Sequence, residues 1–488
     1  MGAVNGESAG GAREANDATR GSAVKLGAEV TSRVLGLATT LLLIRGLRAA
    51  VFGSFTALSA YALLLAESGE LGLQALASRA LVARTLSLRS LVLARLALAP
   101  LVAAVALAAS TAVPALAGRW GVGALDGPAL ALLVAWFALS GWGEFLGVAL
   151  RCRRARRQEA ALLVVLRGAA LAAAAAALFA GASLRGVSLA LALSPLPAIA
   201  LGAVLLRRAS GEGPAPEARP ASVLGESFPL AVHGALLLLS PRVELLVLQW
   251  LRGEGDPALG FFSVALNVLW FLSMVPTAIV AGAMPALTRE ALRGEGPVRR
   301  RTAATVALGA APAAVGLALV APPLAGALLG AGYGPSGYAA VAVCLRIMAL
   351  GLPALFLNAL VFGALIAAGR ASWLPRLTAA RVALAFALAF VLVPAFGGRG
   401  ASAGLACAEW ALLAAGVAAC RRASFAVPVA APVAWALVAC VPMALAVSGV
   451  RSSLPLAVGV GALSWGATLA AALWLRPGLA RELVGASR

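Results

Sequence analysis

Five arginines lie inside long apolar stretches of the sequence: Arg33, Arg167, Arg242, Arg346 and Arg381. A charged side chain inside a long apolar stretch is costly, so such residues are rare and usually face a cavity or a partner. Arginine stays protonated, and its planar guanidinium matches the oxygens of a phosphate. We therefore predict that these arginines bind an anionic group, with Arg33 and Arg242 the strongest candidates. The alternatives are structural ion pairs and side chains that reach the interface.

The acidic residues at similar depth include Glu29, Glu67, Glu70 and Glu244, our candidates for ion coupling. Glu67 and Glu70 are three residues apart and share a helical face, so their repulsion favours a proton on one of them. The competing interpretation places this pair in a hydrated vestibule without a role. Glu29 precedes Arg33 by four residues, so these two charges could instead neutralise each other. Glu144 and Glu409 are the other acids at depth.

Composition indicates which elements hold these residues. Of the 488 residues 62% are hydrophobic and 12% charged, and apolar runs longer than 18 residues recur throughout. This pattern is typical of an all-α polytopic membrane protein, and no hydrophilic block is large enough for a separate soluble domain. The net charge of +20 comes from short basic clusters between the apolar runs, which argues against nucleic-acid binding. The five cysteines lack metal-ligand spacing, so we predict no metal site. No enzyme motif occurs with the structural context that it requires, so we also predict no cofactor and no enzymatic activity.

We predict fourteen transmembrane helices. Two six-helix lobes and two additional C-terminal helices account for them, with Pro and Gly at most junctions. The predicted segments are a disordered tail (1–21), an N-lobe (22–206), a flexible linker (207–226), a C-lobe (227–420), helices 13 and 14 (427–475) and a second tail (476–488).

The distribution of Lys and Arg predicts the orientation in the membrane. With the N-terminus inside, cytoplasmic segments carry 27 of these residues and outside segments carry 7. Positive charge accumulates on the cytoplasmic side of membrane proteins. Both termini are therefore predicted to be cytoplasmic, in a cell (inner) membrane.

The sequence predicts an internal repeat that relates the two lobes, and chance matching in an Ala- and Arg-rich chain is the alternative. At an offset of 214 residues Arg167 matches Arg381, and at an offset of 207 Gly53 matches Gly260. Parallel repeats of this kind occur in alternating-access transporters, whose substrate site lies between the repeats.

Several segments also resemble a known family: ESFPLAVHGALLLLSPRVELLVLQWL, GFFSVALN, VPTAIVAGAMPALTRE and PAFGGRGASAGLACAEW. They look like those of the Wzx-type oligosaccharide and polysaccharide flippases of the multidrug/oligosaccharidyl-lipid/polysaccharide (MOP) exporter superfamily. The resemblance implies movement of undecaprenyl-pyrophosphate-linked sugar units, precursors of O-antigen, capsule or exopolysaccharide, from the cytoplasmic to the periplasmic leaflet. It also implies contact with membrane lipids, and with a polysaccharide polymerase and chain-length partners.

Three alternative functions remain open. A lipid II flippase would use the same architecture. An exporter of cationic drugs of the MATE type would need a net acidic cavity, so the exposure of the deep charges distinguishes it from a flippase. An integral membrane sugar polymerase or ligase is disfavoured because every predicted outside loop is about a dozen residues or shorter, whereas catalytic residues commonly occupy sizeable loops.

Overall fold

The computed structural model describes residues 27–69, 73, 76–77, 80–81, 85–119, 126–153, 155–208, 216–253, 255–293, 297–330, 333–450 and 453–475. Fourteen helices in these ranges are long and apolar enough to cross a membrane, which confirms the predicted all-α fold class. Glu70 and both tails lie outside the described residues.

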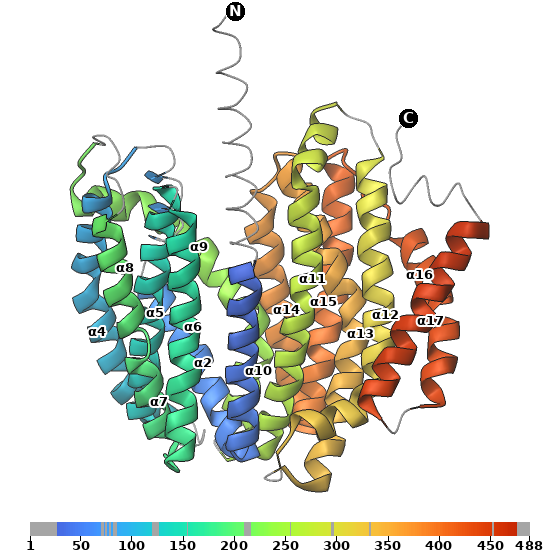
Figure 1. The fold of residues 1–488 in the computed structure, drawn as a ribbon, viewed down its shortest axis with the longest axis horizontal. Coiled ribbons are helices and arrows are strands. Elements are labelled where there is room, and N and C mark those ends of the chain that lie inside the picture. The colour runs from blue at the N-terminus through green and yellow to red at the C-terminus, as the bar shows by residue number, and fades with distance from the viewer. Residues whose placement is uncertain are drawn as a thin grey trace, which may run out of the picture. The chain divides into compact units, whose positions relative to one another are not determined.

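The first span is Gly27–Gly46. The remaining helices (Figure 1) are α2 (Ala49–Gly69), α4 (Leu88–Arg119), α5 (Gly127–Cys152), α6 (Arg156–Phe179), α7 (Leu184–Leu193), α8 (Leu196–Arg208), α9 (Pro220–Leu239), α10 (Val243–Arg252), α11 (Pro257–Arg293), α12 (Val298–Leu328), α13 (Gly334–Ala367), α14 (Trp373–Phe396), α15 (Gly398–Arg422), α16 (Ala430–Ser448) and α17 (Leu454–Leu475).

The span before α11 is broken at a short 3-10 turn, Ser240–Arg242, between α9 and α10. Pro241 explains the break, because proline lacks the backbone N–H that a continuous helix requires. The Arg242 guanidinium donates to the Leu238 carbonyl at 2.8 Å, which satisfies one backbone acceptor at the break. Glu244 therefore lies directly after an irregular turn, at the start of a new helix.

The chain divides into two compact units, and their boundaries fall within or beside helices. Unit 1 comprises Met1–Gly46 and Leu58–Ala235, and unit 2 comprises Leu47–Ala57 and Leu236–Arg488. The first turns of α2 thus belong to unit 2, whereas the rest of that helix belongs to unit 1. The lobe and linker boundaries predicted from the sequence stay predictions.

Unit 1 has a core of buried side chains from α4, α5 and the start of α9. Leu91, Phe145 and Val223 are fully buried or nearly so in this cluster. The chain before α9 is held by α4, since the Ser87 N–H donates to the Pro216 carbonyl and the Ala218 N–H to the Ser90 hydroxyl, both at 2.9 Å. Residues 216–219 therefore pack within unit 1, beside the start of α4.

Unit 2 is organised around α13, which packs against α11, α12 and α15. Most of its side chains are buried, including Phe356 and Leu357. The two C-terminal helices, α16 and α17, pack together and against α12 (Figure 1). Small residues such as Ala307 and Ala311 on α12 allow Cys440 and Met443 of α16 to approach closely.

Two glycines allow α2 and α11 to meet at backbone contact within unit 2. A Cβ atom on Gly53 would lie 2.6 Å from the Gly260 nitrogen, and one on Gly260 would lie 2.1 Å from the Ala49 carbonyl oxygen. No side chain fits at either position. These are the two glycines that the predicted repeat places in equivalent positions.

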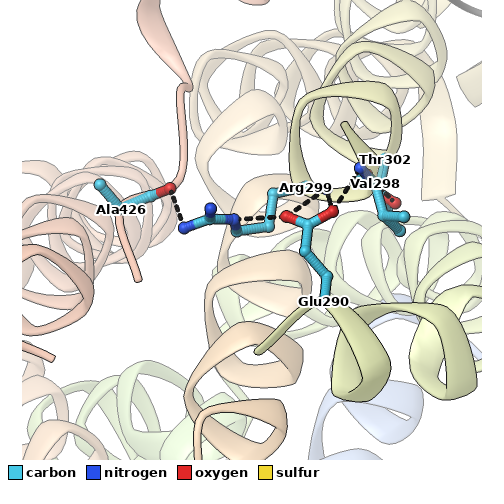
Figure 2. A network of polar contacts seen from close by, with 5 residues as sticks. All are labelled: Glu290, Val298, Arg299, Thr302 and Ala426. Carbon is cyan, nitrogen blue, oxygen red and sulfur yellow. Dashed lines mark hydrogen bonds and ion pairs between the residues drawn. The ribbon is translucent and has the colours of Figure 1, made fainter. Parts of the chain in front are cut away.

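A polar network joins the end of α11 to α12 and to the loop before α16 (Figure 2). The buried Glu290 carboxylate accepts hydrogen bonds from the Val298 and Arg299 N–H groups, which caps the N-terminus of α12. Arg299 pairs with Glu290 at 2.6 Å and donates to the Ala426 carbonyl at 3.3 Å. Its guanidinium also lies 4.1 Å from the Phe425 ring centroid. The network fixes the loop that leads to α16.

Candidate functional site: a buried ionic cluster in unit 2

Four helices of unit 2 each contribute one polar side chain to a buried cluster: Glu244 (α10), Asn358 (α13), Arg381 (α14) and Glu409 (α15). Arg381 lies between the two carboxylates. Its Nη2 atom is 3.2 Å from Glu244 Oε1 and 3.1 Å from Glu409 Oε1, and its Nε donates to Glu409 Oε1 at 3.2 Å. One guanidinium therefore forms ion pairs with both carboxylates.

Asn358 completes the cluster from the central helix of the unit. Its Nδ2 group donates to Glu409 Oε2 at 2.8 Å and to the Glu409 backbone carbonyl at 3.0 Å. The amide thus orients the Glu409 carboxylate toward Arg381. Both oxygens of Glu409 are occupied as a result.

The cluster has unused hydrogen-bonding capacity. Glu244 Oε2, Arg381 Nη1 and Asn358 Oδ1 are buried and have no hydrogen-bond partner in the structure. With all three ionisable groups charged, two carboxylates and one guanidinium carry a net charge of −1. Burying a net charge is costly, so the arrangement favours uptake of one positive charge.

Glu244 lies in a helix, α10, that is almost entirely buried. Every residue of α10 from Val243 to Gln249 is buried, and α10 packs against α14 and α15, which carry Arg381 and Glu409. The Glu244 side chain itself is fully buried. Its interactions are therefore confined to the cluster.

Two other predicted arginines make contacts within their own units. In unit 1, Arg167 Nη2 lies 3.1 Å from Glu144 Oε1, and the two side chains are 41% and 35% exposed. In unit 2, half-buried Arg242 lies 4.8 Å from the Trp270 ring centroid, a cation–π contact, in addition to its bond to Leu238. Arg167 and Arg242 are thus partly accessible.

Arg33 and Arg346 are exposed within their spans. Arg346 Nε donates to the Ala318 carbonyl on α12 at 3.3 Å. No carboxylate of the described residues pairs with Arg33 or Arg346. The ion pair considered between Glu29 and Arg33 is therefore not formed. Glu29 and Glu67 are half-buried.

The predicted residues Glu244 and Arg381 come together, although the sequence assigned them to different roles. Sequence reasoning did not place Glu409 or Asn358 in a site. Glu409 had one available signal, its position as an acid in an apolar run, whereas nothing distinguished Asn358.

No group of three or more His, Cys, Asp or Glu side chains among the described residues could hold a metal ion.

The structure of this chain is similar to several solved structures. The structure is similar to that of the lipid II flippase MurJ in an inward closed conformation, with TM-score 0.75 and 11% identity over 94% of this chain and 99% of that chain. It is also similar to an inward-facing MATE-family multidrug resistance transporter of the MOP superfamily, with TM-score 0.60 and 15% identity over 82% and 97% of the two chains.

A third similar structure is that of a mutant of the Vibrio cholerae MATE transporter VcmN, with TM-score 0.54 and 18% identity over 83% of this chain and 97% of that chain. No model of a known protein family matches the chain, and no curated protein matches it in sequence. At these identities the similarity shows the fold alone. The chain has the multi-pass fold of MOP-superfamily flippases and transporters.

Proposed function

We propose that this protein is a transporter that moves undecaprenyl-pyrophosphate-linked oligosaccharide units across the membrane by alternating access. The observation that carries this proposal is the exposure of the charges within the spans. The exposed ones among those considered are Arg33 and Arg346, and neither has a carboxylate partner among the described residues. Exposed guanidinium groups inside a membrane protein suit a phosphate-bearing substrate.

The described acidic residues within the spans are less accessible than Arg33 and Arg346, which argues against an exporter of cations. Glu244 and Glu409 are buried beside Arg381, Glu144 is paired with Arg167, and Glu29 and Glu67 are half-buried. None of these acids is as exposed as Arg33 and Arg346. A cation exporter would need accessible carboxylates that lack arginine partners. The balance of accessible charge therefore favours an anionic substrate.

A lipid II flippase is the second candidate, and the similarity to MurJ over almost the whole of both chains favours it. Both substrates carry a polyprenyl pyrophosphate and differ in the attached sugars. The exposed arginines suit the group that the two substrates have in common. The nature of the sugar must therefore be decided by experiment.

The buried cluster is our proposed coupling site. Protonation of Glu244 would remove the net charge of −1 that Arg381 leaves uncompensated. Glu244 Oε2 has no hydrogen-bond partner and would gain a donor hydrogen on protonation. Proton uptake by this cluster would then change the packing of α10 against α14 and α15.

Gene deletion tests the substrate directly. Deletion should cause an undecaprenyl-pyrophosphate-linked oligosaccharide to accumulate on the cytoplasmic side, measured by lipid extraction and by the accessibility of the sugar to an external enzyme. Normal levels of this lipid in the deletion strain would exclude the proposal. Accumulation of lipid II in the same extracts would instead support the second candidate.

Complementation tests the arginines. Arg33→Gln and Arg346→Gln proteins that reach the membrane at normal levels should restore less than a tenth of the transport, because each loses an exposed charged donor worth about 1.5–3 kcal/mol. Arg185→Gln is the matched control, since Arg185 pairs with Asp126 on the surface of unit 1 and should restore transport fully.

A further inference from the structure

Arg346 donates a hydrogen bond to a backbone carbonyl of the neighbouring helix α12 that lacks its usual helical donor. Pro322 has no N–H group, so the carbonyl four residues earlier, that of Ala318, lacks its normal helical donor. Arg346 Nε donates to this carbonyl at 3.3 Å. The guanidinium is thereby fixed on the surface of α13 through one nitrogen.

The remaining guanidinium donors of Arg346 face an exposed surface. The residue is exposed, and no described carboxylate or aromatic ring contacts its guanidinium. Its Nη1 and Nη2 groups present the two parallel donors that bind phosphate oxygens. The helix break thus orients the arginine while its phosphate-binding edge remains available.

An apolar strip continues from Arg346 along the same face of α13. Leu350, one turn further along, is 68% exposed. Trp410 of α15 is 43% exposed, and its Nε1 group donates to the Leu350 carbonyl at 2.9 Å. Arg346, Leu350 and Trp410 therefore form one surface with a cation at one end and apolar side chains at the other.

The depth of Arg346 fits the headgroup region of a lipid. Twelve residues separate it from Gly334, about 18 Å along the helix axis, and the 34 residues of α13 span about 51 Å. With α13 centred on a hydrocarbon core of about 30 Å, Arg346 lies roughly 8 Å inside the boundary at the Gly334 end, within reach of the interface. The predicted orientation makes this the outer leaflet.

We propose that the surface of Arg346, Leu350 and Trp410 is a binding site for a phosphate-bearing lipid. The Arg346 guanidinium binds the phosphate, and Leu350 and Trp410 contact the hydrocarbon chain. Two lipids supply this chemistry, an anionic phospholipid of the bilayer and a polyprenyl pyrophosphate. The second rests on the proposed function, and the first does not.

Native mass spectrometry of the full-length protein in detergent tests the site with three added lipids: phosphatidylglycerol, undecaprenyl pyrophosphate and diacylglycerol, which lacks phosphate. The wild-type protein should retain one or both phosphate lipids and not diacylglycerol. Arg346→Gln keeps a donor for the Ala318 carbonyl but removes the charge, and should weaken binding about tenfold. Arg252→Gln is the matched control, because Arg252 is also exposed and donates to the backbone carbonyls of Val393 and Pro394.

A second variant keeps Arg346 intact. Leu350→Glu places a carboxylate one turn away, where it pairs with Arg346, so phosphate binding should be lost while the bond to Ala318 remains. Unchanged binding by both variants, equal loss in Arg252→Gln, or equal retention of diacylglycerol would each overturn the site. Binding of phosphatidylglycerol alone would identify a bilayer lipid and leave the flippase proposal to the deletion experiment, whereas tighter binding of the pyrophosphate would identify the substrate.

Discussion

The predicted repeat places Arg381 and Arg167 at equivalent positions, and their surroundings in the structure differ. Arg381 is buried between two carboxylates, whereas Arg167 shares a partly exposed pair with Glu144. A buried cation that is removed leaves its partners uncompensated, while a partly exposed pair is screened by solvent. The same substitution should therefore have very different effects at the two positions.

Arg381→Met should lower the free energy of unfolding by about 3–5 kcal/mol, because Glu244 and Glu409 would lose their shared cation. Arg167→Met should cost about 1 kcal/mol or less. Thermal unfolding of the purified variants in detergent measures both. The triple variant Glu244→Gln/Arg381→Met/Glu409→Gln should recover most of the loss, and a triple variant as unstable as Arg381→Met would contradict the electrostatic explanation.

The bond from Arg346 to Ala318 should depend on Pro322. Arg346→Ala should cost about 1 kcal/mol in the wild-type protein, because the Ala318 carbonyl would lose its side-chain donor. In a Pro322→Ala background the restored N–H can serve that carbonyl, so the cost of Arg346→Ala should fall toward zero. A double-mutant cycle on thermal stability measures this coupling. Equal costs in both backgrounds would show that the bond does not serve the proline break.

The sequence predicted which charges were unusual but not how they pair. Arg381 and Glu244 stood out because ionisable side chains are rare in apolar runs. Their pairing could not be predicted, since they are 137 residues apart and meet only through the packing of α10 against α14. Asn358 gave no signal, because a single amide in an apolar helix is compatible with many environments.

The crossing of α2 and α11 depends on two residues without side chains. Gly53→Ala and Gly260→Ala should each destabilise the protein, because the added methyl group would meet backbone atoms that cannot move aside. Gly282→Ala is the control on α11, where nothing lies within 4 Å of the added Cβ atom, and it should be neutral or stabilising by up to about 1 kcal/mol. Thermal unfolding compares the three, and similar behaviour of all three would refute the close crossing.

Ser424, in the loop before α16, has a left-handed backbone conformation with φ 55°. Glycine adopts this conformation without steric cost, so Ser424→Gly should stabilise the protein by about 0.5–1 kcal/mol. Ala423→Gly, at φ −80°, should instead destabilise it, because there glycine only adds freedom to the unfolded chain. The difference in melting temperature between the two variants measures the effect. A lower melting temperature for Ser424→Gly would argue against strain at this residue.

The helices were predictable because each of the fourteen spans is a long apolar run. Their interruptions were less predictable. Pro241 breaks its span with a 3-10 turn, whereas Pro276 and Pro285 lie inside the continuous helix α11. The difference depends on how neighbouring groups satisfy the carbonyls that proline leaves without a donor, and that information is tertiary.

The orientation of the whole chain is testable independently of transport. Alkaline phosphatase fused after Arg252 should be active, and the same enzyme fused after Arg293 should be inactive, because the excess of Lys and Arg places the second site in the cytoplasm. A fluorescent protein at the C-terminus should fold and fluoresce inside the cell. The reverse pattern of phosphatase activity would invert the predicted topology.

The division of α2 between the two units determines how this protein can be divided into separately expressed fragments. Unit 2 is discontinuous in sequence, because it includes Leu47–Ala57 as well as the chain from Leu236 onward. A fragment beginning at Leu236 would lack the helical turns that contact Gly260 and would expose that backbone surface. Co-expression of two fragments divided at residues 209–215 keeps residues 47–57 attached to unit 1 and available to unit 2. Reassembly of such a divided protein would then depend on two exchanged segments, because residues 47–57 of the first fragment belong to unit 2 and residues 216–235 of the second fragment belong to unit 1.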